Sequence, residues 1–324
     1  MNKRLWLVAA LVALLLAVTP FLGIVAVDPR ALLRETPASF IFWQLRLPRA
    51  LLGFAAGGIL ALAGLICQSL FRNNLATPDL MGVSSGAAAG AVVALELKGR
   101  LAGLGIGGPT LFSFLGALAA ILLIFAIARM VRSFSLYTLL MSGVAINFFF
   151  SAVIVIFQYV LDFADTFSLL RWLTGGIVVA GYFEAVFLLA LLAAFLGLAW
   201  IFRQELLLLA AGDDFAESRG LDAAAFRRWA FVGLAVFVGA VVSLCGPIGF
   251  VALVVPHLSR SWGRCRQGET MAFTVLLGGG LLVLADLLAR SLLPPVEVPV
   301  GVVTSLLGAP FFLVLLLAQL RRGE

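Results

Sequence analysis

Long apolar runs recur from one end of this chain to the other, and they constrain its fold more than any other feature. A helix that crosses a bilayer needs about 20 predominantly apolar residues. Candidate runs cover approximately residues 5–27, 49–71, 79–97, 109–131, 136–160, 182–203, 227–245, 247–263, 271–290 and 299–320. Because lipid offers no hydrogen bonds to the backbone, such runs form helices. We therefore predict an all-α integral membrane protein with about ten transmembrane helices in a single polytopic domain, residues 1–324.

The composition agrees with burial in lipid. Hydrophobic residues make up 63% of the chain and charged residues only 12%, with a mean hydropathy of +1.15, whereas soluble domains carry about 25% charged residues. The first run is longer than the apolar core of a signal peptide, so we interpret it as an uncleaved first helix. The seventh and eighth runs are separated only by Gly246-Pro247. This dipeptide is either a tight turn between two helices or a kink in one, which would leave nine spans.

The basic residues predict an orientation. With ten spans and the N-terminus inside, 14 of the 22 lysines and arginines fall on the cytoplasmic side. They are Lys3, Arg4, Arg72, Arg129, Arg132, Arg203, Arg219, Arg227, Arg228, Arg260, Arg264, Arg266, Arg321 and Arg322. Cytoplasmic loops of membrane proteins are enriched in Lys and Arg. We therefore expect both termini to lie inside.

Sequence motifs for catalysis are absent. The chain has no GxxxxGK[ST] phosphate loop, HExxH motif or GxSxG motif. Its three cysteines, Cys67, Cys245 and Cys265, are far apart and show no metal-type spacing, and we expect Cys67 and Cys245 to pack as small hydrophobic residues. The sequence thus predicts no catalytic residue, no cofactor and no metal site, and we expect a transport subunit that is not itself an enzyme.

Acidic residues are sparse in the apolar runs. Asp79, Glu184 and Asp286 all lie near predicted span ends, whereas an ion-coupled transporter is expected to carry carboxylates at mid-membrane. This distribution favours a transporter that takes its energy from another subunit. The alternative is a stand-alone ion-coupled secondary transporter.

Two polar stretches are expected on the outer side. In Trp43–Arg49, Arg46 and Arg49 form a positive patch, and Pro48 suits the first turn of the second span. The arginines are either a docking patch or anchors that extend to the membrane surface. Farther along the chain, Asp286 and Arg290 are four residues apart and are expected to pair on one helical face.

Two more stretches are expected on the inner side. Asn73–Asp79 is a polar connection between two spans, which is either a simple turn or part of a gate. Ala211–Leu221 is expected to contain a short helix that Asp213 or Asp214 caps and Gly220 closes. This helix is either a docking element for a partner or a solvated loop.

Together with Gly246–Arg260 and Ala285–Phe312, these stretches resemble the FecCD family in order and spacing. FecCD proteins are the permease subunits of type II ABC importers for iron–siderophore, haem and vitamin B12. The resemblance runs from about Arg46 to Phe312, and the WQ-x-RLPR stretch is similar to the vitamin B12 permeases. It implies the type II importer fold and alternating-access import of a ferric siderophore, haem or cobalamin across a bacterial or archaeal cytoplasmic membrane.

The resemblance also implies partners. A second copy of the chain, or a paralogous permease, is expected alongside it in the bilayer. Two ATP-binding subunits are expected on the cytoplasmic side, and a periplasmic substrate-binding protein on the other. No nucleic acid is expected, because the basic residues lie in short loops between apolar runs.

Finally, the resemblance assigns roles to residues. Binding-protein docking falls to Arg46, Arg49 and Arg290. ATPase coupling, within a segment of about residues 204–226, falls to Gly212, Asp213, Glu217 and Gly220. The cytoplasmic gate falls to Asn73 and Leu75, with a second element at Tyr137 and Thr138. One departure is visible, because the family commonly has Asn-Pro where this chain has Asn73-Asn74.

Overall fold

A computed structural model describes residues 3–23, 28, 36–97, 108–131, 135–179, 181–261 and 267–322. The longer helices are α1 (Lys3–Val18), α3 (Leu47–Phe71), α4 (Val83–Glu96), α6 (Gly108–Met130), α7 (Leu136–Val160), α9 (Phe183–Ile201), α12 (Ala223–Cys245), α14 (Gln267–Ser291) and α15 (Val300–Arg322). The shorter ones are η1 (Thr19–Phe21), α2 (Pro37–Phe40), η3 (Ile41–Arg46), η4 (Pro78–Met81), α8 (Phe163–Leu173), α10 (Arg203–Ala211), α11 (Asp213–Ser218) and α13 (Val251–Ser261).

The all-α membrane fold is confirmed, and an α-helix lies in every predicted span. Within the described residues, seven helical segments are long and apolar enough to cross a membrane. The helices at the other three predicted spans, α4, α13 and the apolar part of α15, are shorter. The alternative of one kinked helix at Gly246-Pro247 is wrong, because α12 ends at Cys245 and α13 starts afresh at Val251. The number of spans stays a prediction. Gly246, with φ +67°, closes α12 in a conformation that favours glycine.

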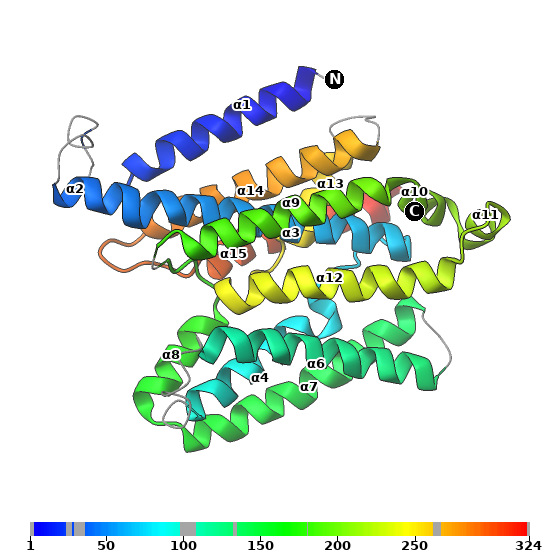
Figure 1. The fold of residues 1–324 in the computed structure, drawn as a ribbon, viewed down its shortest axis with the longest axis horizontal. Helices are drawn as coiled ribbons and strands as arrows, with labels where there is room; N and C mark the ends of the chain where they lie inside the picture. Colours follow the sequence, from blue (N-terminus) through cyan, green and yellow to red (C-terminus); the bar gives the residue numbers. More distant parts are fainter. Residues whose placement is uncertain are drawn as a thin grey trace. The chain divides into compact units, whose positions relative to one another are not determined.

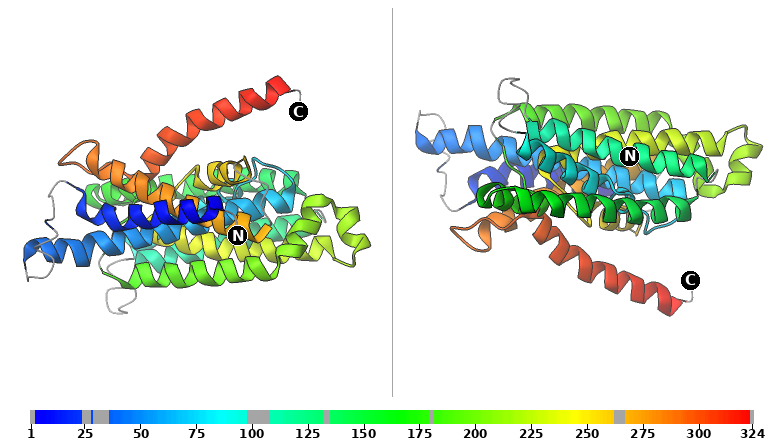
Figure 2. Two further views of the ribbon diagram at one scale, coloured as in Figure 1. Left: turned by 90° about the horizontal axis from the view of Figure 1, so that it is seen from above. Right: turned by 90° about the horizontal axis from the view of Figure 1, so that it is seen from below.

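Contacts divide the chain into two compact units. The first unit comprises Met1–Leu62, Gly175–Trp200 and Ile248–Glu324. In it, α1 packs along α14, with a cluster formed by Val8, Val12 and Phe273. Helix α15 contacts α13 and α14 near its start and then runs away from them (Figure 2).

The second unit comprises Ala63–Thr174 and Ile201–Pro247. In this unit, α4 contacts α6, α7 and α12 (Figure 1). Small residues make this possible, since a Cβ atom on Gly86 would lie 2.4 Å from the carbonyl oxygen of Gly116 on α6. The short α4 is therefore largely buried inside its unit. The expectation of a single permease domain stays a prediction.

The second span differs from its predicted start. Helical structure begins at Pro37, capped by Thr36, and continues through η3 into α3, so Pro48 lies inside the helix. Proline lacks an N–H and clashes with an α-helical turn, but η3 is π-helical, and Leu47 N–H bonds to the Phe42 carbonyl. The wider turn accommodates Pro48. The Trp43 carbonyl, which Pro48 has no N–H to reach, instead accepts a 2.6 Å hydrogen bond from the Tyr182 hydroxyl.

Helices α3 and α14 cross closely within the first unit. A Cβ atom on Gly278 would lie 2.3 Å from Ala61 Cβ and 2.5 Å from the Gly57 carbonyl oxygen. Because a backbone atom cannot rotate away, we expect Gly278→Leu to cost about 3 kcal/mol in unfolding free energy, the upper end of the usual range for an overpacked core. Thermal unfolding in detergent measures the loss. The matched control is Gly197→Leu on α9, where nothing lies within 4 Å, and equal melting temperatures for the two variants would contradict this packing.

Candidate functional site

The first candidate site is an ion-pair cluster in the first unit, formed by Arg49, Asp286, Arg290 and Glu297, and we refer to it as the arginine cluster. Arg49 lies in the first turn of α3, and Asp286 and Arg290 lie in the last two turns of α14. Glu297 follows α14 in the connection to α15. The 3.6-residue period of α14 places Asp286 directly beside Arg290.

Asp286 is the centre of this cluster. Arg49 donates from Nε to Asp286 Oδ1 over 3.0 Å, and its Nη2 lies 2.9 Å from the same oxygen. Arg290 Nε lies 3.1 Å from Asp286 Oδ2, so the predicted pair between these two residues is confirmed. Arg49 Nη1 also donates to Glu297 Oε2 over 3.0 Å.

Burial makes these pairs mutually dependent. The side chains of Asp286 and Arg290 are 2% and 6% exposed, whereas that of Glu297 is 41% exposed. A buried charge is costly unless it is paired. Asp286 therefore neutralises two arginines that the apolar surroundings would otherwise disfavour. The shared partner was predictable for Arg290 from the spacing, but nothing in the sequence links it to Arg49, which is 237 residues away.

Arg46 lies near this cluster but has different partners. Its Nη1 donates to the carbonyl oxygens of Pro20 and Phe21, over 3.2 and 3.4 Å, at the end of the first span. It is also close enough to Arg290 for their positive charges to interact. The structure thus brings the three predicted docking arginines into one region, and among the described residues the carboxylates of Asp286 and Glu297 lie in it too.

The second candidate site is the Asn73 turn, residues 73–77, in the second unit. Asn73 Oδ1 accepts a 2.8 Å hydrogen bond from Leu75 N–H, and the Asn73 carbonyl accepts one from Ala76 over 3.1 Å. This Asx turn is closed by the side chain of Asn73. The turn therefore forms with Asn74 in place of the proline that the family pattern commonly has there.

Tyr137 and Thr138, the second predicted gate element, lie at the start of α7 in the same unit. Ser135 caps this helix by accepting from Thr138 N–H over 3.2 Å. The Tyr137 side chain is exposed. Helix η4, which follows the Asn73 turn, packs against α7.

The third candidate site is the predicted coupling segment, which folds as α10 and α11. Gly212 joins the two helices with φ +137°, and Gly220 follows α11 with φ +84°. Both backbone conformations favour glycine, so the prediction that Gly220 closes a short helix is confirmed. The capping prediction is wrong, because Gly212 is the N-cap and neither Asp213 nor Asp214 is. Both acids instead lie in the first turn, where the helix dipole favours negative charge.

The side chains of α11 divide between solvent and interior. Asp214, Phe215 and Glu217 face outward, and Phe215 packs its ring against the guanidinium of Arg219, 5.4 Å from the ring centroid. Ala216 is fully buried. An exposed aromatic residue beside carboxylates on a short, anchored helix is a suitable contact surface for another protein.

Asp213 is held by arginines that sequence analysis did not connect to it. Arg227 Nη2 donates to Asp213 Oδ1 over 2.7 Å, and Arg72 Nη2 lies 3.8 Å from the same oxygen. Arg227 Nε also donates to the Leu70 carbonyl over 3.0 Å. These residues come from separate helices and a loop, so no helical spacing could have revealed the contacts.

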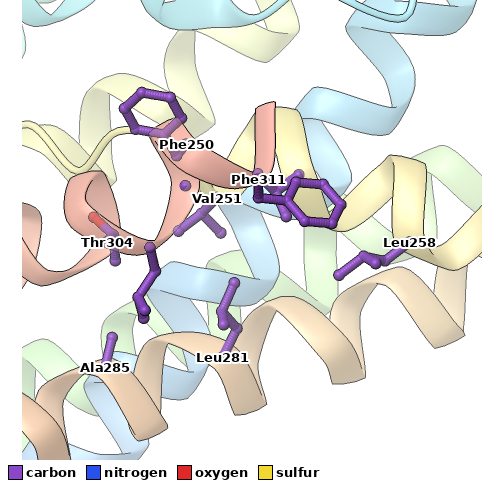
Figure 3. A pocket seen from close by; sticks show the side chains of 10 residues that line it. Phe250, Val251, Leu258, Leu281, Ala285, Thr304 and Phe311 are labelled. Atoms are coloured by element: carbon purple, nitrogen blue, oxygen red, sulfur yellow. The ribbon is translucent and has the colours of Figure 1, made fainter. Parts of the chain in front are cut away.

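The first unit also contains an apolar cavity of about 200 Å³. Helices α13, α14 and α15 contribute its lining, which includes Val251, Leu281 and Phe311 (Figure 3). Thr304 also lines it. The sequence did not single out this cavity.

Metal chemistry finds no support in the part of the chain that the structure describes, where no group of three or more His, Cys, Asp or Glu side chains could hold an ion. Cys67 and Cys245 are buried, as predicted for cysteines that pack as small hydrophobic residues, and Cys265 lies outside the described residues.

These features define a class of protein: a helical membrane protein with buried ion pairs and an anchored surface helix. The family comparison makes the assignment specific, because residues 7–318 match the FecCD transport family. The chain belongs to the FecCD transport family, and it is a transport permease.

Relatives agree along nearly the whole chain. The vitamin B12 import system permease BtuC of Klebsiella pneumoniae is 37% identical over 329 residues, which cover 99% of this chain and 96% of that protein. The Fe(3+) dicitrate transport system permease FecD of Escherichia coli is 35% identical over 91% of this chain and 92% of that protein. An ABC transporter permease of Bacillus subtilis, YvrB, is 36% identical over 88% of this chain and 80% of that protein.

Solved structures share the fold. A metal-chelate type ABC transporter in an inward-facing conformation has a TM-score of 0.83 and 28% identity, over 97% of this chain and 98% of that one. PsaBC from Streptococcus pneumoniae has a TM-score of 0.59 at 23% identity, over 83% and 90%, which shows likeness of fold alone. The prediction of the type II importer permease fold is thereby confirmed.

Proposed function

We propose that this permease is the membrane subunit of an ATP-driven importer that carries a metal chelate from the periplasm to the cytoplasm by alternating access. The substrate class is a ferric siderophore, haem or cobalamin. The observation that carries the proposal is the agreement with importer permeases along nearly the full length of both chains. One relative is named for vitamin B12 and another for ferric dicitrate, and the two are about equally similar to this chain. The proposed substrate class therefore includes more than one kind of chelate.

The surroundings proposed for this subunit follow the same family assignment. It spans the bacterial inner membrane with both termini in the cytoplasm, next to a second copy or a paralogous permease. Its cytoplasmic partners are two ATP-binding subunits, which hydrolyse the ATP, and its periplasmic partner is a substrate-binding protein. The predominance of Lys and Arg in the predicted inner loops supports this orientation.

The region of Arg46, Arg49 and Arg290 is proposed to receive acidic residues of the binding protein. Among the described residues, this region gathers three arginines beside Asp286 and Glu297, and clustered arginines favour an acidic partner. Arg46 is proposed to make this contact directly, and its Nη1 donates to the carbonyl oxygens of Pro20 and Phe21. Arg49 and Arg290 are engaged with Asp286, so their role is to hold the ends of α3 and α14 together and to contribute to the local field.

The α10–α11 segment is proposed to dock in the ATP-binding subunit. Gly212 and Gly220 set the entry to and exit from α11, Asp213 anchors it, and Glu217 faces outward. The exposed Phe215 supplies an apolar contact beside that carboxylate. Such a mixed surface is typical of a protein interface with a small apolar centre and a polar rim.

The Asn73 turn and the start of α7 are proposed to form the cytoplasmic gate. Asn73 and Leu75 belong to one compact turn, and Tyr137 and Thr138 begin the helix against which η4 packs. A gate needs segments that change conformation as units, and short turns at helix ends are suited to that role.

Uptake by cells tests the proposed function. Cells that lack this chain are compared with complemented cells for uptake of radiolabelled ferric dicitrate, a hydroxamate ferric siderophore, haem and cyanocobalamin. We expect at least one uptake activity to disappear and to return only when this chain and its ATP-binding subunit are both present. Identical uptake of all four compounds with and without the chain would contradict the proposed substrate class.

A further inference from the structure

Arg227 joins two of the candidate sites of the second unit. Its Nη2 donates to Asp213 in the first turn of α11, and its Nε donates to the Leu70 carbonyl in the last turn of α3. The Arg227 side chain is 14% exposed, so both contacts are sheltered from water. One guanidinium therefore bridges the predicted coupling helix and the helix that leads into the Asn73 turn.

The end of α3 explains why Leu70 is available. The last four carbonyl groups of a helix have no partner within it, and Arg72 then leaves the helix with φ +50°. Asn73 N–H returns to the Gln68 carbonyl over 3.2 Å. The Leu70 carbonyl oxygen accepts a hydrogen bond from the guanidinium of Arg227. The negative end of the helix dipole also favours a cation at this position.

Arg72 adds a weaker contact to the same carboxylate. Its Nη2 lies 3.8 Å from Asp213 Oδ1, and its side chain is 50% exposed. An exposed pair at this distance contributes little free energy. Its position matters nonetheless, because Arg72 immediately precedes the Asn73 turn. Asp213 is thus connected to the end of α3 in two ways. The strong connection runs through Arg227 to the Leu70 carbonyl, and the weak one is the contact with Arg72.

We propose that Arg227 is a positioning residue that transmits movement of α11 to the Asn73 turn, through Asp213 on one side and the Leu70 carbonyl on the other. This inference rests on the proposed function, in which α11 receives the ATP-driven movement and the turn gates the exit. The link is short and charge-assisted, so a displacement of α11 pulls on the end of α3 directly. Arginine suits the position because its planar fork presents separate N–H groups to two acceptors, whereas lysine has one ammonium group on a flexible stem.

The test is the number of chelate molecules transported per ATP hydrolysed, measured with the assembled transporter in proteoliposomes. A charge-assisted hydrogen bond is strong enough for its loss to change this ratio by about tenfold. We expect that fall for Arg227→Gln and for Arg227→Lys, with the ATP-binding subunit still copurifying in wild-type amounts. The matched control is Arg228→Gln, which removes an exposed neighbouring arginine and should leave the ratio unchanged.

A double-mutant comparison separates transmission from general damage. If Asp213 and Arg227 act through one link, Asp213→Asn lowers the ratio, and the Asp213→Asn/Arg227→Gln variant is no worse than the more affected single variant. If Arg227→Gln fails to assemble, Asp213→Asn alone is decisive, because it leaves the bond to Leu70 intact. A wild-type ratio in an assembled Arg227→Gln or Asp213→Asn variant, or additive losses in the double variant, overturns the inference. Failure of the proposed function is a different result, since the wild-type assembly would then show no ATP-driven transport.

Discussion

An Asp286→Ala variant is expected to lose about 3–5 kcal/mol of unfolding free energy, because removing one partner of a buried ion pair leaves an uncompensated charge. Two cations depend on this carboxylate. Arg290 is almost fully buried beside it, and Arg49 donates to it while keeping Glu297 as a second partner. The measurement is the unfolding temperature and the folded yield of the purified permease in detergent.

Glu297→Ala is the matched control for that experiment. Its carboxylate is 41% exposed and pairs with the same arginine, and a solvent-accessible ion pair contributes about 0–1 kcal/mol. We expect a small change in unfolding temperature for this variant and a large one for Asp286→Ala. Similar losses in the two variants would show that Asp286 is not the centre of the arginine cluster.

Charge reversal at Arg46 is expected to reduce both affinity for the periplasmic binding protein and chelate uptake by at least about a hundredfold. Replacing a favourable charge contact by like-charge repulsion at an interface changes the free energy of binding by several kcal/mol. The measurement is the dissociation constant of the purified binding protein on the permease in nanodiscs. Binding by Arg46→Glu with wild-type affinity would remove Arg46 from the docking surface.

Arg46 is a sharper choice for this experiment than Arg49. A glutamate at position 49 would face Asp286 and Glu297, so loss of binding could not be separated from loss of folding. The matched control is Arg171→Glu at the end of α8, an exposed basic residue that is also on the predicted periplasmic side. It changes the net charge equally, and we expect it to bind the binding protein normally.

Much of the fold was predictable because lipid restricts the choices open to the chain. Each apolar run predicted a helix, and the structure has a helix at every one. The error at the second span is instructive, because Pro48 was interpreted as a helix start. The π-helical segment η3 precedes it, and the Trp43 carbonyl accepts its hydrogen bond from the hydroxyl of Tyr182, which is 139 residues away. Local sequence does not reveal such a tertiary compensation.

In the candidate sites, contacts between residues close in sequence were predictable, and contacts between distant segments were not. Asp286 and Arg290 share a helical face, so their pair follows from spacing alone. Asn73 closes its own turn, which is also a local effect. The contacts from Arg49 to Asp286 and from Arg227 to Asp213 required folding to bring distant segments together. These long-range pairs also changed the interpretation of the site, since they assign structural roles to residues that motif resemblance placed on docking surfaces.

The most direct test of the proposed ATP-driven import is transport by purified components in proteoliposomes. Vesicles contain the permease with or without its ATP-binding subunit, the binding protein is loaded with radiolabelled chelate outside, and ATP is enclosed. We predict accumulation only when the permease, the ATPase, the binding protein and ATP are all present, with no effect of ionophores that collapse ion gradients. Accumulation by the permease alone, driven by an imposed proton or sodium gradient, would contradict the account and identify a secondary transporter.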